Sequence, residues 1–191
     1  MTQQIDEVSE LTVQQFAACG RAAARARPIL FSGSMVRAVL DSTKTQTRRP
    51  IGRLMEACPH GTIGELLWVR ETWCQPDPLS RDVVYRADVP NARLVEERQL
   101  QREVGHGAYA PWRPSIHMPR WAARILLEIT AVRLEHLQSI NAAGALREGI
   151  EAPCILDKYE RLWNSVYSRR ARCSWADNPM VWVITFRRLV P

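Results

Sequence analysis

The segment Met180–Phe186 constrains the fold most, because six of its seven residues are apolar. A strand directs alternate side chains to opposite faces of a sheet. A run that is apolar at both sets of positions therefore predicts a central strand that is covered on both faces. A second segment, Arg124–Leu134, alternates between apolar and polar residues, which predicts a half-buried strand beside it.

Shorter patterns place further elements along the chain. Ser32 or Ser34 is a suitable N-cap for one helix, and Gly149 is a natural residue to follow the end of another. The predicted strands cover residues 28–31, 66–70 and 82–86, and the predicted helices cover residues 34–41, 139–148 and 159–166. Several strands with short helices between them predict an α+β fold, with a small barrel as one arrangement.

Three segments do not fit this pattern. Residues 41–50 are polar up to a closing proline and predict an exposed loop or the irregular start of a strand. Residues 1–26 predict a separate N-terminal extension, either helical or flexible. Residues 88–111 are charged and without period, which predicts an insertion in a domain that covers residues 27–191.

The charge of the chain is compatible with a nucleic-acid partner. Lysine and arginine total 26 against 20 aspartate and glutamate residues, a net charge of +6, and only Lys44 and Lys158 are lysines. Arginine grips phosphate and stacks on bases. A genome coding bias that replaces lysine by arginine on ordinary surfaces explains the composition equally well.

The cysteines and the hydropathy exclude several classes of protein. The five cysteines form no C-x-x-C pair, which argues against a secreted disulfide framework and against a zinc site. No run approaches the length of about 18 apolar residues that spans a membrane. The polar, acidic residues 1–11 do not resemble a secretory signal, so we expect a cytoplasmic protein without a membrane partner.

The segment Lys44–Arg49 combines an amine, two hydroxyls and two guanidiniums. A lysine in a partly dry cleft can act as a base, and a threonine within its reach can act as a nucleophile. In an extended chain the side chains of Lys44 and Thr47 point to opposite faces, so their convergence requires a curled loop. The alternative is a solvated basic loop without chemistry.

Two segments combine tryptophans with cations. Trp68–Trp73 encloses an Arg-Glu pair, and Trp112–Trp121 adds two prolines, two arginines and a histidine. A rigid surface of aromatic rings and cations suits a single-stranded nucleic acid or an unstacked base. Core tryptophans beside a surface ion pair are the alternative. Glu148, at the end of a predicted helix, is a weak candidate for a proton donor.

The order of these segments resembles an ASCH domain, a branch of the PUA-like superfamily, in the version carried by phages and prophages. The hallmark lysine and the arginine five residues later fall on Lys44 and Arg49, while Ser42 stands where glycine is usual and Gly64-Glu65 replaces Gly-Asp. The match covers residues 28–189 through six segments: residues 28–40, 44–50, 67–73, 85–88, 112–121 and 182–187.

The resemblance implies a small PUA-like β-barrel with helices around it and a cleft lined by positive charge. Members of the family are expected to bind RNA or modified nucleosides. One bacterial branch hydrolyses N4-acetylcytidine without a metal or other cofactor. Its catalytic lysine, threonine and glutamate fall on Lys44, Thr47 and Glu148. The implied partner is a nucleoside or nucleic acid, RNA rather than DNA, and protein partners stay open.

The resemblance and the two tryptophan segments also indicate binding residues. We expect Trp73, Tyr85 or Trp121 to stack on a base and Arg70 or Arg113 to contact sugar or phosphate. The full predicted set is Thr45, Arg48, Arg49, Arg70, Glu71, Trp73, Tyr85, Arg86, Arg113, Ser115, His117, Arg120 and Trp121.

Three alternatives to an amidohydrolase stay open. The first is a non-catalytic RNA- or DNA-binding module. The second is a ribonuclease that uses His117 and Lys44 as acid and base. The third is an interaction module of a phage or prophage process that binds its partner through residues 1–26.

Overall fold

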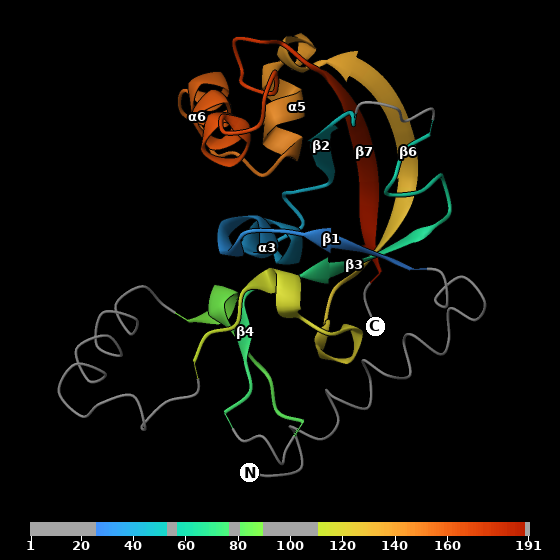
Figure 1. Cartoon of the computed structure of the whole chain (residues 1–191), viewed down its shortest axis with the longest axis vertical. Coiled ribbons are helices and arrows are strands. Elements are labelled where there is room, and N and C mark those ends of the chain that lie inside the picture. Colours follow the sequence, from blue (N-terminus) through green and yellow to red (C-terminus); the bar gives the residue numbers. More distant parts are fainter. Residues whose placement is uncertain (1–25, 53–56, 77–80, 90–110, 190–191) are drawn as a thin grey trace, which may run out of the picture.

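Five strands form one mixed sheet in the order β1-β3-β6-β7-β2 (Figure 1). The computed structural model describes residues 26–52, 57–76, 81–89 and 111–189. Nearly all of the predicted N-terminal extension and insertion therefore lies outside the described residues. The strands are β1 (Arg27–Leu30), β2 (Gln46–Pro50), β3 (Leu66–Arg70), β6 (Leu126–His136) and β7 (Met180–Leu189).

Strand β7 occupies the interior of the sheet, as its sequence predicts. It pairs with β6 on one side and with β2 on the other, antiparallel in both cases. Val181 and Val183 belong to one hydrophobic cluster, whereas Trp182 and Ile184 belong to another. Both sets of side chains are buried because separate cores cover the two faces of this strand.

Helices and a small second sheet surround the main sheet, so the predicted α+β fold is confirmed. Residue Ser32 is the N-cap of the first helix, and its hydroxyl accepts a hydrogen bond from the backbone N–H of Met35. The helices are α3 (Gly33–Leu40), α5 (Ala142–Arg147) and α6 (Ile155–Tyr167). The 3-10 turns are η1 (Arg86–Asp88), η2 (Ser115–His117), η3 (Arg120–Ala122) and η4 (Leu137–Ser139). The second sheet pairs β4 (Trp73–Cys74) with β5 (Val84–Tyr85).

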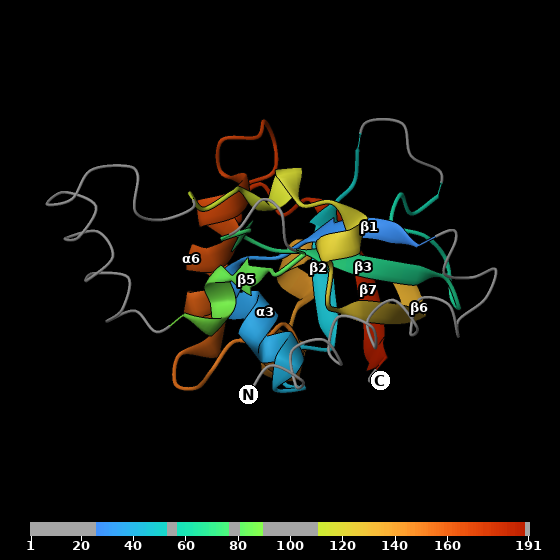
Figure 2. The ribbon, with the colours of Figure 1, turned by 90° about the horizontal axis from the view of Figure 1, so that it is seen from below.

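The helices lie on different parts of the sheet. Helices α5 and α6 pack together beside β2 and β7, while α3 lies next to β1 (Figure 1). Viewed from below, the small sheet and η1 lie in front of α3 (Figure 2). Contacts between α3 and η1 join this part to the main domain. Across the described segments, no helix is both long and apolar enough to cross a membrane.

The predicted barrel is wrong in one respect, because the described strands form an open sheet. Strand β3 pairs with β6 over only the first residues of β6, and a bulge between Ile129 and Ala131 interrupts the long pairing of β6 with β7. A bulge bends the strand that contains it. The edge strands β1 and β2 share no ladder. A side chain spans the gap instead, since Arg49 Nη2 donates to the carbonyl oxygen of Leu30 at 2.9 Å.

Of the two alternatives predicted for the polar segment 41–50, the structure shows the start of a strand and not an exposed loop. Its second half is β2, in which four of five residues are buried. Polarity along the sequence suggested exposure to water, but Thr47, Arg48 and Arg49 have hydrogen-bond partners inside the protein, and Gln46 donates from Nε2 to Thr185 while its Oε1 has no partner. The strand is therefore a polar edge of the core rather than a solvated loop.

Candidate functional site

Two helix ends bring Lys44 and Glu148 together. After α3, the N–H groups of Ser42 and Thr43 donate to the carbonyls of Val39 and Ala38, the bonding pattern of a Schellman motif. Ser42 takes the left-handed conformation with φ 59°, which explains why glycine is usual there. Helix α5 ends in the same way at Glu148, followed by Gly149. The two ends then pair, because Lys44 and Glu148 form a β-bridge.

Gly149 permits this close approach. Its φ is +83°, and a Cβ placed on it would lie 2.7 Å from the Cβ of Ala38 and 3.1 Å from that of Lys44. Contacts below 3.0 Å require the neighbouring backbone to move. The absence of a side chain at this position therefore lets the end of α5 reach Lys44.

The Lys44 ammonium is buried and fully hydrogen-bonded. It is 2% exposed, and Nζ donates to the Gln46 carbonyl at 2.8 Å, to the Glu148 carbonyl at 2.9 Å and to Glu148 Oε2 at 2.8 Å. An ammonium has three donors, so each has an acceptor. Burial lowers the pKa of Lys44, while the carboxylate of Glu148 acts in the opposite direction.

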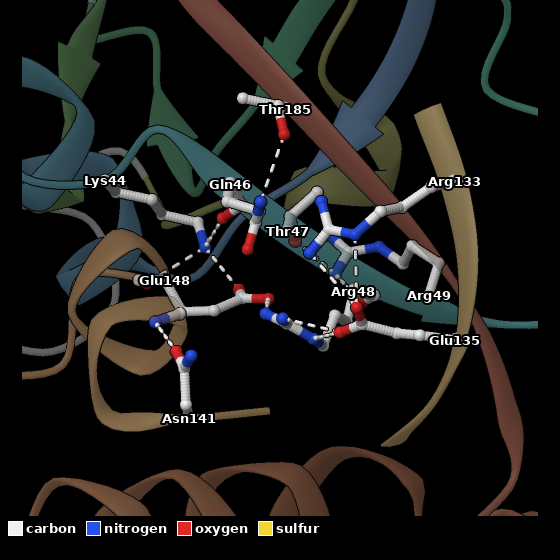
Figure 3. A network of polar contacts seen from close by, with 11 residues as sticks. Lys44, Gln46, Thr47, Arg48, Arg49, Arg133, Glu135, Asn141, Glu148 and Thr185 are labelled. Carbon is white, nitrogen blue, oxygen red and sulfur yellow. Dashed lines mark hydrogen bonds and ion pairs between the residues drawn. The ribbon is translucent and has the colours of Figure 1, made fainter. Parts of the chain in front are cut away.

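The Glu148 carboxylate lies between two cations (Figure 3). Its second oxygen, Oε1, accepts from Arg48 Nη1 at 3.1 Å. Arg48 also donates to Glu135 Oε1 from Nε at 2.9 Å and from Nη2 at 2.7 Å. Arg133 pairs with the same Glu135 nearer to the surface. Alternating charges thus run from the buried Lys44 to solvent.

The free edge of β2 faces this network. The carbonyl of Thr45 accepts a hydrogen bond from the N–H of Phe186 in β7. In an antiparallel pair the hydrogen-bonded residues alternate, so the backbones of Thr47 and Arg49 also face β7, and the carbonyls of Gln46 and Arg48 point away from it. Lys44 Nζ and Arg49 Nη1 donate to these two outward carbonyls. The side chains of Lys44 and Arg49 therefore donate hydrogen bonds to the unpaired edge of β2.

Thr47 lies on the other face of β2 from Arg48. The strand is extended, so the curled loop that would turn Thr47 toward Lys44 is not formed. The hydroxyl of Thr47 accepts from Arg49 Nη1 at 2.9 Å. The N–H of Thr45 donates to Arg147, which ties the start of the strand to α5. The structure brings Lys44 and Glu148 into contact, and the role of Thr47 stays a prediction.

A cavity of about 620 Å³ opens beside the free edge of β2. Arg48 and Arg49, from opposite faces of the strand, both line it because the cavity lies along the edge. Glu148 lines it as well, so the acidic member of the buried Lys44–Glu148 pair is accessible from the cavity. The remaining walls come from the end of β1, from α3, from α6 and from Thr72 and Ser115.

Aromatic rings form the apolar walls of the cavity. Phe31 lies on one side, with the guanidinium carbon of Arg49 5.6 Å from its ring centroid. Tyr159, Trp163 and Tyr167 of α6 also line the cavity, and the last two rings lie 4.4 Å apart. The spacing of residues 159–166 predicted this helix, but its aromatic residues were not among the predicted site residues.

Comparison with solved structures identifies the fold. No protein-family model and no curated protein sequence matches the chain. A crystal structure of an ASCH domain from Lactobacillus crispatus JV V101 has a TM-score of 0.51 to this chain, with 12% sequence identity over 98% of this chain and 97% of that chain. The chain has the fold of an ASCH domain. This confirms the fold that the sequence resemblance predicted, whereas the phage-type branch and the amidohydrolase similarity stay predictions.

A second solved structure is similar over most of the ASCH fold. It is a protein from Enterococcus faecalis V583 described by the family model DUF984, with a TM-score of 0.48 and 8% identity over 86% of this chain and 80% of that chain.

The ASCH fold places several other predicted site residues in a separate ion cluster. Glu71 is 1% exposed, and both of its oxygens accept from Arg124 at 2.9 and 3.0 Å. Arg124 also pairs with Asp88 and lies 3.9 Å from the ring centroid of Tyr85. Burial raises the pKa of Tyr85 to about 12, and its hydroxyl donates to a backbone carbonyl. This cluster joins β5 and η1 to the start of β6.

The predicted tryptophan surface lies beside that cluster. Trp73 is buried, with Arg113 5.0 Å above its ring and the half-exposed Trp121 packed edge-on at 5.9 Å. Two more cations lie over tryptophan rings, Arg70 over Trp68 and Arg86 over Trp112. His117 is exposed and Arg120 is half-buried. Of the whole segment 112–121, Ser115 lines the cavity.

Within the segments that the structure describes, no three histidine, cysteine, aspartate or glutamate side chains are grouped as metal ligands would be.

Replacement of Gly149 by alanine tests the close approach of the two helix ends. Gly149→Ala should lower the free energy of unfolding by about 2–4 kcal/mol, because strain at positive φ adds to a clash with α3. Gly64→Ala is the matched control, since Gly64 has φ +85° with nothing within 4 Å of an added Cβ. The control should lose only about 1–2 kcal/mol in urea denaturation. Equal losses in the two variants would contradict the argument.

A second prediction concerns His60, which lines the cavity. Burial, together with the charges of Arg49 and Arg27, lowers the pKa of His60 to about 4 from 6.5. Between these values the unfolded chain binds more protons than the folded protein, so the fold loses stability as pH falls from 6.5 to 4.

His60→Gln should remove this contribution. The free energy of unfolding of the variant should fall less between pH 6.5 and pH 4 than that of the wild type. His117→Gln, at an exposed histidine, should follow the wild-type curve. Parallel curves for all three proteins would show that His60 titrates normally in the fold.

Proposed function

We propose that this protein binds a nucleobase of the cytosine type in the cavity beside β2, either as a nucleoside or within RNA. One observation carries the proposal: a carboxylate and two guanidiniums line a cavity whose walls also include four aromatic rings. Pockets of about 300–1,000 Å³ with apolar walls and a few convergent polar groups are typical of small-ligand sites.

The polar groups match the edge of cytosine. Glu148 is held as an acceptor by Lys44 and Arg48, and carboxylates accept from the exocyclic N4 amine of cytosine. The guanidinium of Arg48 or Arg49 is a donor for the ring nitrogen and carbonyl oxygen of the base. This donor–acceptor combination favours a base with one amine beside two acceptors.

The aromatic walls match the faces of a base. Stacking on aromatic side chains stabilises an unstacked base by about 1–3 kcal/mol. Phe31 and the three rings of α6 provide such faces on two walls of the cavity. His60 stays neutral at physiological pH, because burial lowers its pKa, and it adds a polar edge without another charge.

Removal of an N4-acetyl group is a second candidate function, favoured by the burial of Lys44 against Glu148. Proton transfer along their 2.8 Å hydrogen bond converts the ion pair into a neutral amine and a neutral acid. This step requires β2 to curl from its extended form, in which Thr47 lies on the other face from Arg48 and does not line the cavity. The Lys44 amine would then accept the Thr47 proton while Thr47 Oγ1 forms a bond to the acetyl carbon. The C–N4 bond breaks as the Glu148 acid protonates N4. Water then hydrolyses the acetyl-threonine ester and releases acetate.

A calorimetric titration with cytidine and N4-acetylcytidine tests the binding function. The wild type should bind both, and Glu148→Gln should bind at least about 10-fold more weakly, because a base-edge contact contributes about 1–3 kcal/mol. Glu151→Gln makes the same charge change at an exposed position and should bind normally. No binding to the wild type, or equal binding by both variants, would overturn the proposal.

Acetate measured in the same samples tests the second candidate. Wild-type protein should release acetate from N4-acetylcytidine, and Lys44→Met should not, because it lacks the amine that accepts the threonine proton. Circular dichroism checks that the variant is folded. Binding without acetate release would reject hydrolysis and leave the binding function intact. Undiminished release by Lys44→Met would reject the Lys44 mechanism.

A further inference from the structure

An arginine-rich turn follows α6 directly. Residues 168–172 are all exposed and include Arg169, Arg170 and Arg172, a set that was not part of the sequence-based prediction. Over the sixteen residues 161–176 the chain has four arginines and no aspartate or glutamate. We call residues 168–172 the arginine turn. The nearest acids in the sequence, Glu160 and Asp177, flank this window, and the charge of Arg172 acts on Asp177. Arg169 and Arg170 are therefore the two cations of the turn on which the inference depends.

The arginine turn is attached to the wall of the cavity. Arg170 N–H donates to the carbonyl of Tyr167, a residue that lines the cavity. Trp163 lines it as well, and its indole N–H donates to the carbonyl of Cys173 at 2.8 Å on the far side of the turn. The N–H of Trp175 donates to Asn164 Oδ1 at 2.9 Å. The aromatic residues of the cavity wall thus also hold the turn in place.

The position of the turn separates two kinds of ligand. A free nucleoside has no phosphate, so exposed cations outside the cavity add nothing to its binding. A base that belongs to a chain carries phosphates on both sides, and these must lie outside the cavity while the base is within it. Arginine is the side chain best suited to such phosphates, because its planar fork donates two parallel hydrogen bonds.

We propose that the arginine turn binds the phosphodiester backbone of a single-stranded nucleic acid whose base occupies the cavity. This inference rests on the proposed function, since it takes the cavity to be a base-binding site. Charge complementarity favours a polyanion, and the continuity of the turn with the aromatic wall favours one that carries bases.

The test uses a short fluorescein-labelled single-stranded oligoribonucleotide with one central cytidine, in fluorescence anisotropy titrations. The variant R169Q/R170Q removes two exposed charges from the turn. Each lost phosphate contact should reduce the slope of log K against log salt by about 0.7. Two lost contacts therefore remove about 1.4 log units of affinity over the decade from 1 M to 0.1 M salt, so the variant should bind about 25-fold more weakly than the wild type at about 0.1 M salt. R81Q/R187Q removes two charges at exposed positions that do not line the cavity and should bind like the wild type.

The outcomes distinguish the two proposals. Equal affinity and equal salt slope for the two double variants would overturn the assignment of the turn, even if the wild type binds cytidine. Binding of the oligonucleotide no tighter than that of cytidine would overturn it too. An acidic peptide that binds the turn as tightly as the oligonucleotide would identify a protein ligand and also overturn it. Failure of the wild type to bind cytidine would instead reject the base-binding cavity.

Discussion

The ion pair between Lys44 and Glu148 is the interaction on which the rest of the site depends. Both charges are removed from water, which costs several kcal/mol per ion unless hydrogen bonds compensate. Here the ammonium has three acceptors and the carboxylate is bound by a second cation, Arg48. Loss of one member of a buried pair typically costs about 3–5 kcal/mol, because the other charge stays buried alone. The pair therefore joins the end of α3, the edge strand β2 and the end of α5 into one unit.

The open sheet has a direct consequence for the site. A closed barrel would pair β1 with β2 along their backbones and leave no space between them. In this protein Arg49 spans the gap with its side chain and reaches the carbonyl of Leu30. The cavity lies along the unpaired edge, lined by Arg48 and Arg49 from the two faces of β2. The hallmark arginine is thus both a structural link between the edge strands and a cation at the cavity.

Sequence reasoning predicted individual elements better than their partners. The alternation in Arg124–Leu134 and the apolar run at Met180–Phe186 predicted two adjacent strands, since periodicity follows directly from which faces are buried. For the segment 41–50 the sequence left open an exposed loop or the start of a strand, because polar side chains that are buried with partners inside the protein have the same composition as a loop. The aromatic residues of α6 were predicted to lie on a helix but were not named as site residues, since helical spacing does not distinguish a packed face from one that lines a cavity. Trp73 and Tyr85 belong to a second cluster with Arg113 and Arg124.

The sequence by itself determined the α+β class, the interior position of β7 and the helix end at Gly149. It also indicated the segment Lys44–Arg49, which contains one of the chain's two lysines, as a candidate site. These depend on local periodicity, on backbone conformation and on residue type. The resemblance had grouped Lys44 with Glu148, and the tertiary structure decided that the two residues, 104 positions apart, form a direct ion pair. It also decided that the aromatic rings of the cavity are Phe31 and those of α6 rather than the tryptophans of the two tryptophan segments. Contacts between distant residues depend on how strands pair and helices pack, and a hydrogen bond that closes over such a distance leaves no period in the sequence.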